Sequence, residues 1–387
     1  MWCVFLGIPE VENRHITPDE IHLKNVGTFS ILQKPVKVEA VGIFPGVAEQ
    51  ITWRRQILEN SNTTTSSEND VGAIRKIAKN KFDQVNTHSN DAVGLPVIAY
   101  LGTSRVYGAG RNTLRSNDHR LSRQIFKEGY QDWDEMKATK FHFQEWLATY
   151  DTLVGQGREY NRTKEAFFDT VRIANPYLTE LSFNNGELWA RVDMEGNISD
   201  FLPLSLHSDG IHYYTVMVAE LAYRCIVLNG FLNELAIIES KGVVMIDELD
   251  LHLHPNWQRH VVSDLKRAFP NLQFIVTTRS PFIVQSLESD ELINLDNSEV
   301  QSFSPDELHL NKVATEIMGV KSVRSEDFES RFKKASEELD KIEDANKALT
   351  TEDYIQISKT LGKLIKDETN DPELKAFLDK EIDGENI

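Results

Sequence analysis

Two short apolar runs joined by an amphipathic segment constrain the fold more than any other feature of this sequence. The runs read GVVMI at 242–246 and LQFIVTT at 272–278, and buried parallel strands require such continuous apolar stretches. Apolar residues in the linking segment recur at helical spacing: Trp257, Val261, Val262 and Leu265. A strand, a crossover helix and a second strand form a right-handed unit in which both strands run the same way. We therefore predict an α/β fold built on a parallel sheet.

Two adjacent carboxylates, Asp247 and Glu248, follow the first apolar run directly. Ligands bind at the carboxyl ends of the strands in open α/β sheets, so these acids need not be buried. They should lie beside the TTRSP segment at 277–281, which ends the second run. An Asp at such a place can hold Mg²⁺, and an adjacent Glu can orient and deprotonate an attacking water. The pair predicts a magnesium and water site, although a solvated turn after a strand gives the same two residues.

A zinc site is an alternative interpretation of the loop that follows. Asp250, His252 and His254 occupy alternate positions, and an extended segment could bring their side chains together as zinc ligands. No HExxH sequence accompanies them. The same residues could instead orient the loop or contact a neighbouring subunit.

Composition restricts the partners. With 387 residues, of which 40% are hydrophobic, the chain can bury a substantial core in one or two domains. A net charge of −18 disfavours broad binding to nucleic acid or to anionic membranes. The two cysteines, Cys3 and Cys225, lack the spacing of a metal or disulfide motif. No signal-peptide pattern and no apolar run of about eighteen residues occurs, so we expect a cytoplasmic protein without a membrane span.

One local basic stretch is a candidate for phosphate or nucleic-acid contact. The segment LPVIAYLGTSR at 95–105 is typical of a buried strand that opens into a loop, with Arg105 at its exit. Beyond it Asp118 is the only acid among several basic residues: Arg111, Arg115, Arg120, Arg123 and Lys127. Residues 105–127 therefore form either a solvated loop or a binding surface.

The chain divides into four predicted regions. Residues 1–94 are predicted to be β-rich, because the pattern alternates from about residue 15 to residue 58. We expect the polar stretch at 60–72 to be an exposed loop before the helical segment AIRKIAKNKFDQV. Residues 95–180 give one strand and a mainly helical region. Residues 181–320 contain hairpins, a long apolar helix and the two buried strands, and residues 321–387 predict an acidic helical hairpin.

Taken together, the motifs resemble the SMC-like group of ABC-type ATPases, especially its bacterial branch of AAA-like predicted ATP-binding proteins. VVMIDELDLHLHPNWQ is similar to that family's Walker B strand and D-loop, LSLHSDG to its signature motif, and QFIVTTRSPFIVQSL to its switch strand. LPVIAYLGTSRVYG and ATEIMGV are similar too, so the resemblance covers most of residues 95–387. It implies an ABC-type ATPase core with a mostly parallel central sheet, an inserted helical region and a C-terminal helical hairpin. Some relatives in the wider group act in anti-phage defence.

The resemblance also assigns roles to single residues. Asp247 would hold Mg²⁺, Glu248 would be the general base, and His254 would lie near the D-loop position that meets a second ATPase body. The residues that would contact the γ-phosphate of ATP held by that second body are Ser208, Asp209 and Gly210. A helix N-terminus offers free N–H groups to phosphate, although a Ser-Asp-Gly turn is also an ordinary helix cap. The implied active state is a nucleotide-sandwiched dimer.

Two departures from the family pattern affect activity. Arg279 occupies the switch position that usually holds a histidine; it can bind a phosphate oxygen but cannot relay a proton near neutral pH. The phosphate-binding sequence GxxxxGK[S/T] is absent from the printed chain. Since the family carries that loop after its first strand, we expect an N-terminally truncated ATPase whose own nucleotide site is incomplete.

Two functions follow as hypotheses. The chain is either an ATP-hydrolysing module that drives a nuclease or DNA-associated partner in anti-phage defence, or a non-catalytic interaction protein derived from such an ATPase. The sequence upstream of Met1 separates them: an in-frame GxxxxGK[S/T] there favours the first, and its absence together with stable expression of this form favours the second.

Overall fold

The computed structural model describes two compact units, Met1–Leu308 and His309–Ile387. The residues that it describes are 16, 21–26, 29–44, 47–65, 67–87, 93–103, 129–130, 142–157, 159, 162–295, 304–326, 329–330 and 333. The second unit contributes the short helices α10 (Leu310–Lys312) and η8 (Val313–Ile317). The basic stretch at 105–127 and most of the predicted hairpin at 321–387 lie outside the described residues.

A three-stranded parallel sheet forms the centre of the first unit. Its order is β11 (Leu272–Val276), β10 (Gly242–Ile246) and β5 (Val97–Leu101). In the register, Ile246 pairs with both Leu101 and Val276, so the three strands end in one row. This confirms the predicted α/β fold. It also places the residues that directly follow each strand at one edge of the sheet.

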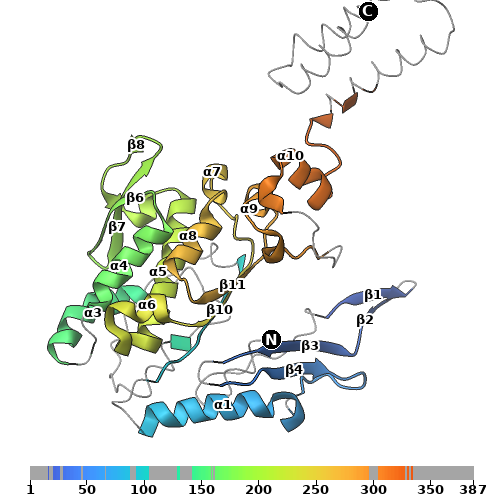
Figure 1. Cartoon of the computed structure of the whole chain (residues 1–387), viewed down its shortest axis with the longest axis horizontal. Coiled ribbons are helices and arrows are strands. Elements are labelled where there is room, and N and C mark those ends of the chain that lie inside the picture. The colour runs from blue at the N-terminus through green and yellow to red at the C-terminus, as the bar shows by residue number, and fades with distance from the viewer. Residues whose placement is uncertain are drawn as a thin grey trace, which may run out of the picture. The chain divides into compact units, whose positions relative to one another are not determined.

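Helices and further strands cover this sheet within the same unit. The helices on the C-terminal side of β5 are α3 (His142–Gly155), α4 (Thr163–Ala174), α5 (Asp209–Asn229), η5 (Gly230–Leu235), α6 (Ala236–Glu239), α7 (Pro255–Gln258), α8 (Val261–Ala268), α9 (Pro281–Gln285), η6 (Ser289–Glu291) and η7 (Pro305–Glu307). Figure 1 shows α5 and α8 on one side of β10 and β11, with α1 and the strands β3 and β4 on the other. One hydrophobic core joins residues from α1, β5, α5, β10 and α8.

The helix α5 is buried along almost its whole length. The segment Asp209–Glu239 is the one candidate membrane span among the described residues, and 83% of its most apolar window is buried inside the protein. The interior of the fold therefore accounts for its apolar sequence.

The crossover between β10 and β11 differs from the single helix that its periodicity predicts. It contains α7 and α8, separated at His260, whose φ and ψ of −131° and −2° are not helical. Trp257, Val261 and Leu265 are buried as predicted, because both short helices turn the same apolar stripe to the core.

An antiparallel sheet precedes α5. Its strands are β6 (Leu178–Asn184), β7 (Glu187–Met194), β8 (Asn197–Ile198) and β9 (Leu202–Pro203). The β6–β7 hairpin turns through Asn185 and Gly186, whose positive φ angles of 52° and 85° suit these two residue types. The chain then passes through η4 (Leu204–Leu206) to the start of α5.

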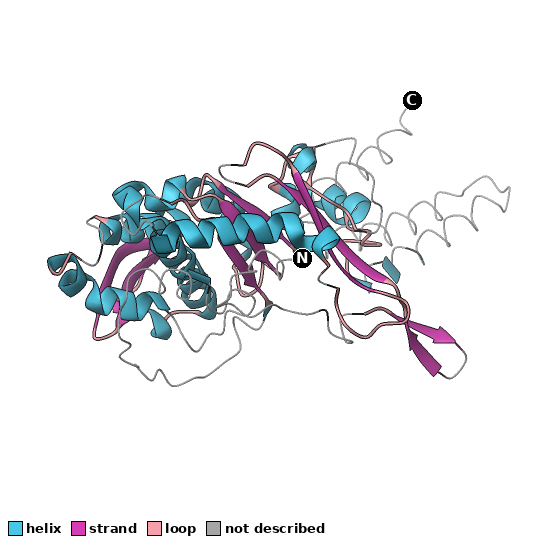
Figure 2. Ribbon diagram, turned by 90° about the horizontal axis from the view of Figure 1, so that it is seen from below, coloured by secondary structure: helices cyan, strands magenta, loops and turns pink. Residues whose placement is uncertain are grey.

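The N-terminal region is β-rich, as predicted. It contains β1 (Leu23–Val26), β2 (Phe29–Leu32), β3 (Val36–Gly42), β4 (Ile51–Ile57) and the long helix α1 (Glu68–Thr87). Helix α1 packs against β4, and it is the long helix in the foreground of the view from below (Figure 2).

The expectation that residues 60–72 form an exposed loop is wrong for their last part. Helix α1 starts at Glu68, and Asp70 in its first turn is only 4% exposed. The Asp70 carboxylate accepts hydrogen bonds from Arg54 at 2.5 Å and Ser67 at 2.7 Å, and these bonds lower its pKa to about 2. A polar sequence packs here because β4 supplies a cation for its acid.

Candidate functional site

The two predicted acids lie at the aligned ends of the parallel strands. Asp247 follows β10 directly, and its N–H donates to the carbonyl oxygen of Leu101 at the end of β5, at 2.9 Å. On the other side, the N–H of Thr277 donates to the carbonyl oxygen of Ile246 at 3.0 Å. Both carboxylate residues, Asp247 and Glu248, are half-buried. The strand ladder therefore fixes the backbone on which the acids stand.

Thr277 connects the two acids and was missed at the sequence level. Its hydroxyl donates to Asp247 Oδ1 at 2.5 Å and accepts from the N–H of Glu248 at 2.9 Å. Glu248 has a positive φ of 49°, which costs on the order of 1–3 kcal/mol in a non-glycine residue and therefore needs support from its surroundings. The only sequence signal was a polar Thr pair at the end of an apolar strand.

The structure brings Arg279 close to Glu248, the residue predicted to be the base. Arg279 Nη2 lies 3.6 Å from Glu248 Oε1, and the Arg279 side chain is 87% exposed. An exposed ion pair of this kind contributes little to stability, since solvent screens it. The guanidinium can therefore exchange Glu248 for an anionic ligand at low cost.

The loop after the acids, residues 249–254, is tied to the end of β11, and we refer to it by its predicted name, the D-loop. Asp250 Oδ1 accepts a hydrogen bond from the Thr278 hydroxyl at 2.5 Å and from the N–H of Arg279 at 3.3 Å. The Ser280 hydroxyl donates to Gln258 Oε1 at 2.5 Å, and Gln258 Nε2 donates to the carbonyl oxygen of Leu253 at 2.7 Å. These bonds join the D-loop and the switch segment into one polar network.

The signature residues pack against the same D-loop. Ser208 and Asp209 are exposed at the N-terminus of α5, and the Ser208 side chain makes no capping hydrogen bond. Gly210 is buried, and a Cβ atom there would lie 2.4 Å from the carbonyl oxygen of His252. Only glycine fits this approach of helix and loop, so the sequence Ser-Asp-Gly has a steric reason beyond capping.

The zinc interpretation gains no support. His254 caps α7 by accepting from the N–H of Asn256 at 3.3 Å, and the ring of His252 lies 6.0 Å from the ring of Tyr213. Asp250 is engaged by the switch segment instead. Across the described ranges, no group of three or more His, Cys, Asp or Glu side chains is placed to hold a metal ion.

The sheet edge that carries Asp247 and Glu248 has groups of the kind that bind Mg²⁺ and nucleotide. Asp247 provides a half-buried carboxylate, a hard ligand of the kind that Mg²⁺ prefers, and Mg²⁺ commonly takes one or two carboxylates together with substrate phosphates. The exposed N-terminus of α5 and the Ser208 hydroxyl offer donors to phosphate. The residues present therefore fit both groups.

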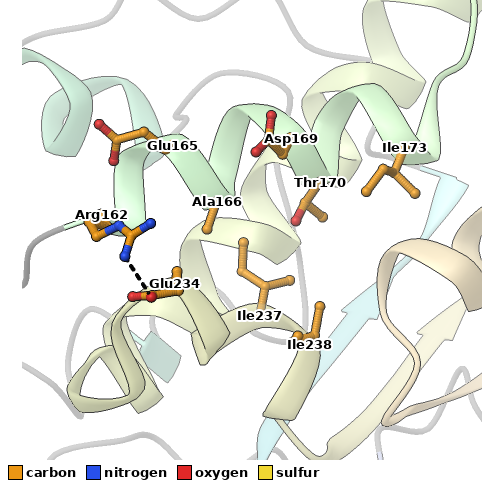
Figure 3. A pocket seen from close by; sticks show the side chains of 9 residues that line it. All are labelled: Arg162, Glu165, Ala166, Asp169, Thr170, Ile173, Glu234, Ile237 and Ile238. Atoms are coloured by element: carbon orange, nitrogen blue, oxygen red, sulfur yellow. Dashed lines mark hydrogen bonds and ion pairs between the residues drawn. The ribbon is translucent and has the colours of Figure 1, made fainter.

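A shallow pocket of about 250 Å³ lies elsewhere, between α4 and the η5–α6 segment (Figure 3). Arg162 and Glu234 form an ion pair of 2.9 Å across it, and Ala166, Thr170 and Ile237 are among its lining residues. None of the predicted site residues lines this pocket. The candidate site is thus the strand edge, not the pocket.

A protein family matches the part of the chain that contains the site. Residues 199–285 match a family described as "AAA domain, putative AbiEii toxin, Type IV TA system". This range starts before the signature turn and ends at the last residue of α9. It therefore contains every predicted site residue: Ser208, Asp209, Gly210, Asp247, Glu248, His254 and Arg279.

Several proteins are related in sequence, and two of them are described as probable ATPases. A retron Ec83 probable ATPase of Escherichia coli is 29% identical over 64% of this chain and 38% of the relative, and a retron Vc95 probable ATPase of Vibrio cholerae serotype O1 biovar El Tor is 31% identical over 36% and 30%. A Septu protein PtuA of Bacillus mycoides (strain KBAB4) is 30% identical over 40% of this chain and 20% of the relative. The matches therefore span less than two fifths of each relative.

Among solved structures, the SMC head domain from Thermotoga maritima aligns with 67% of this chain and 70% of its own at 15% identity, with a TM-score of 0.33. The SmcHead bound to the C-winged helix domain of ScpA aligns with 65% and 69% at 13% identity, also with a TM-score of 0.33. The part of the chain that contains the whole candidate site, residues 199–285, is therefore similar to an AAA domain, and the chain is similar over part of its length to probable ATPases.

Proposed function

We propose that this chain is a magnesium-dependent ATP-binding and ATP-hydrolysing module. The observation that carries the proposal is the convergence of Asp247, Glu248 and Arg279 at the aligned carboxyl ends of β5, β10 and β11. An acidic pair, a cation and a row of strand ends are what phosphoryl transfer to water requires in one place.

The roles follow from the chemistry of each side chain. Asp247 binds Mg²⁺, and Glu248 orients the attacking water and takes its proton. Arg279 contacts a phosphate oxygen, and its guanidinium stays charged throughout. Bound Mg²⁺ would neutralise charge that develops on the phosphate oxygens.

The signature turn faces a partner in this proposal. Ser208 and Asp209 are exposed at a helix N-terminus that Gly210 holds against the D-loop, so this surface is preformed for phosphate on a second ATPase body. His254 is exposed at the end of the same loop. We infer a nucleotide-sandwiched dimer, either of two copies or with another ATPase.

The phosphate-binding loop must come from elsewhere in this proposal. The printed sequence contains no GxxxxGK[S/T], and the strand-edge acids cannot replace its backbone N–H groups and lysine. We therefore propose that the chain alone is inactive and works when such a loop is supplied. We further propose a cytoplasmic role in anti-phage defence with a nuclease or DNA-associated partner, which the retron and Septu relatives support.

The test is magnesium-dependent phosphate release by the chain joined to a GxxxxGK[S/T] segment. We expect Asp247→Asn to lower kcat by about 10²-fold or more, as expected when a metal ligand is lost. The matched control is Asp200→Asn, since Asp200 is an exposed loop residue outside the site. Equal rates in the Asp247 and Asp200 variants would remove Asp247 from the mechanism.

A non-catalytic interaction protein is the second candidate. The absent loop and the Arg279 in place of a switch histidine favour it. In that case, the signature turn and D-loop serve only as a binding surface, and supplying the loop produces no phosphate release above that of Glu248→Gln.

A further inference from the structure

Thr277 is the point at which the two acids are joined, and an inference about it rests on the proposed function. A hydroxyl group carries one donor hydrogen and two acceptor lone pairs. The Thr277 hydroxyl uses its hydrogen on Asp247 and accepts from the backbone N–H of Glu248. One oxygen atom thus binds the side chain of one acid and the backbone of the other.

The backbone of Thr277 is fixed on both sides. Its N–H donates to the carbonyl oxygen of Ile246 at 3.0 Å, and its carbonyl oxygen accepts from the N–H of Leu249 at 3.0 Å. Residues 246 and 249 flank the acid pair, so strand β11 holds this turn from both ends. The hydroxyl therefore reaches Asp247 and Glu248 from a rigid position.

The neighbouring threonine has a different target. Thr278 donates to Asp250 in the D-loop. The two threonines thus divide the loop between them, with Thr277 on the acids and Thr278 on the D-loop. Because the two threonines have different partners, each makes a specific contact, and they are not simply polar residues at the end of a strand.

We propose that Thr277 is a positioning residue that fixes the direction of the Asp247 carboxylate and the left-handed backbone of Glu248, so that both acids face metal and water correctly. Loss of the hydroxyl removes one hydrogen bond to the Asp247 carboxylate and one from the Glu248 N–H. Serine keeps the hydroxyl, whereas valine keeps only the shape.

The first readout needs no nucleotide. Backbone hydrogen exchange is measured on the 387-residue chain in peptides that cover residues 247–251. We expect Thr277→Val to speed exchange at Glu248 by about tenfold, because one protecting hydrogen bond is lost, and Thr277→Ser to match the wild type. Thr179→Val is the matched control, since the exposed Thr179 hydroxyl on β6 donates to the Arg191 carbonyl oxygen at 3.2 Å, far from the acids in the chain.

The second readout is Mn²⁺ binding by electron paramagnetic resonance, with Mn²⁺ as the probe for the magnesium site. We expect Thr277→Val to weaken Mn²⁺ affinity about tenfold, as for other groups that orient a metal ligand, with recovery in Thr277→Ser. Two results would overturn the positioning role. One is a loss of Mn²⁺ affinity in Thr277→Val that Thr277→Ser shows as well, and the other is unchanged hydrogen exchange at Glu248 in Thr277→Val.

An Asp247→Asn variant separates this inference from the proposed function. If it binds Mn²⁺ as the wild type does, or if the wild type binds none, the magnesium role of Asp247 is wrong. The exchange comparison of Thr277→Val with Thr277→Ser then decides the positioning role by itself.

Discussion

At the residue scale, the surroundings of a carboxylate separate structural acids from functional ones. Asp70 is almost fully buried and saturated by donors from Arg54, Ser67 and Thr65. Asp247 and Glu248 are half-buried at an edge where strands end. Carboxylates that remain accessible beside a cation are suited to bind metal and water, whereas Asp70 holds β4 to α1.

Replacing the structural acid should change stability in a pH-dependent way. The Asp70 pKa is lowered from 3.8 to about 2, so its contribution to the free energy of unfolding is present above about pH 4 and is lost as pH falls through 2. We expect Asp70→Asn to lower the free energy of unfolding by about 1–2 kcal/mol at pH 7. Urea unfolding at pH 7 and at pH 2.5 measures this difference.

The control is Glu59→Gln, because Glu59 is exposed in the turn after β4. It should be neutral at both pH values. If Asp70→Asn lowers the free energy of unfolding by as much at pH 2.5 as at pH 7, the ionic explanation is contradicted.

At the element scale, the sequence predicts the strands better than their connections. Continuous apolar runs predicted β5, β10 and β11, and the length of the crossover predicted that β10 and β11 are parallel. The break at His260 was not predictable, because the apolar stripe of the crossover continues through it. Thr277 was missed for a similar reason, since its role depends on a loop 30 residues earlier in the chain.

The contact between α5 and the D-loop gives a prediction for the helix start. In Gly210→Ala, the new methyl group would approach the His252 carbonyl oxygen, and backbone must move to admit it. We expect a loss of about 1–3 kcal/mol in the free energy of unfolding, as for overpacking in other proteins. Thermal unfolding with calorimetry measures it.

Gly155→Ala at the end of α3 is the matched control, because a Cβ atom there meets nothing within 4 Å. It should leave the unfolding midpoint nearly unchanged. Equal midpoints for the two alanine variants would show that the D-loop adapts freely to α5.

At the scale of the whole molecule, our proposal gives this chain one part of a nucleotide site. The acids, the switch arginine and the signature turn all lie within residues 199–285, whereas GxxxxGK[S/T] is absent from the sequence. The order and spacing of the motifs allowed the family to be predicted. An acidic pair alone is too common among proteins to do so. The sequence contains no pattern that identifies the protein supplying the loop or the partner protein.

ATP binding by the chain alone should therefore be weak. Without the phosphate loop, the signature turn and Arg279 offer only a few contacts to the triphosphate. We expect isothermal titration of the 387-residue chain with magnesium and ATP to give a dissociation constant of about 1 mM or weaker. Micromolar binding would show that another segment replaces the loop.

The most direct test of the central claim compares wild type and Glu248→Gln, each joined to a GxxxxGK[S/T] segment, in one assay of phosphate release and ATP retention. Removing the base should lower hydrolysis by about 10²–10⁴-fold while bound ATP is retained. Glu239→Gln serves as the control, because Glu239 is exposed at the end of α6 and lies outside the site. Hydrolysis by Glu248→Gln at the rate of the wild type would contradict the account.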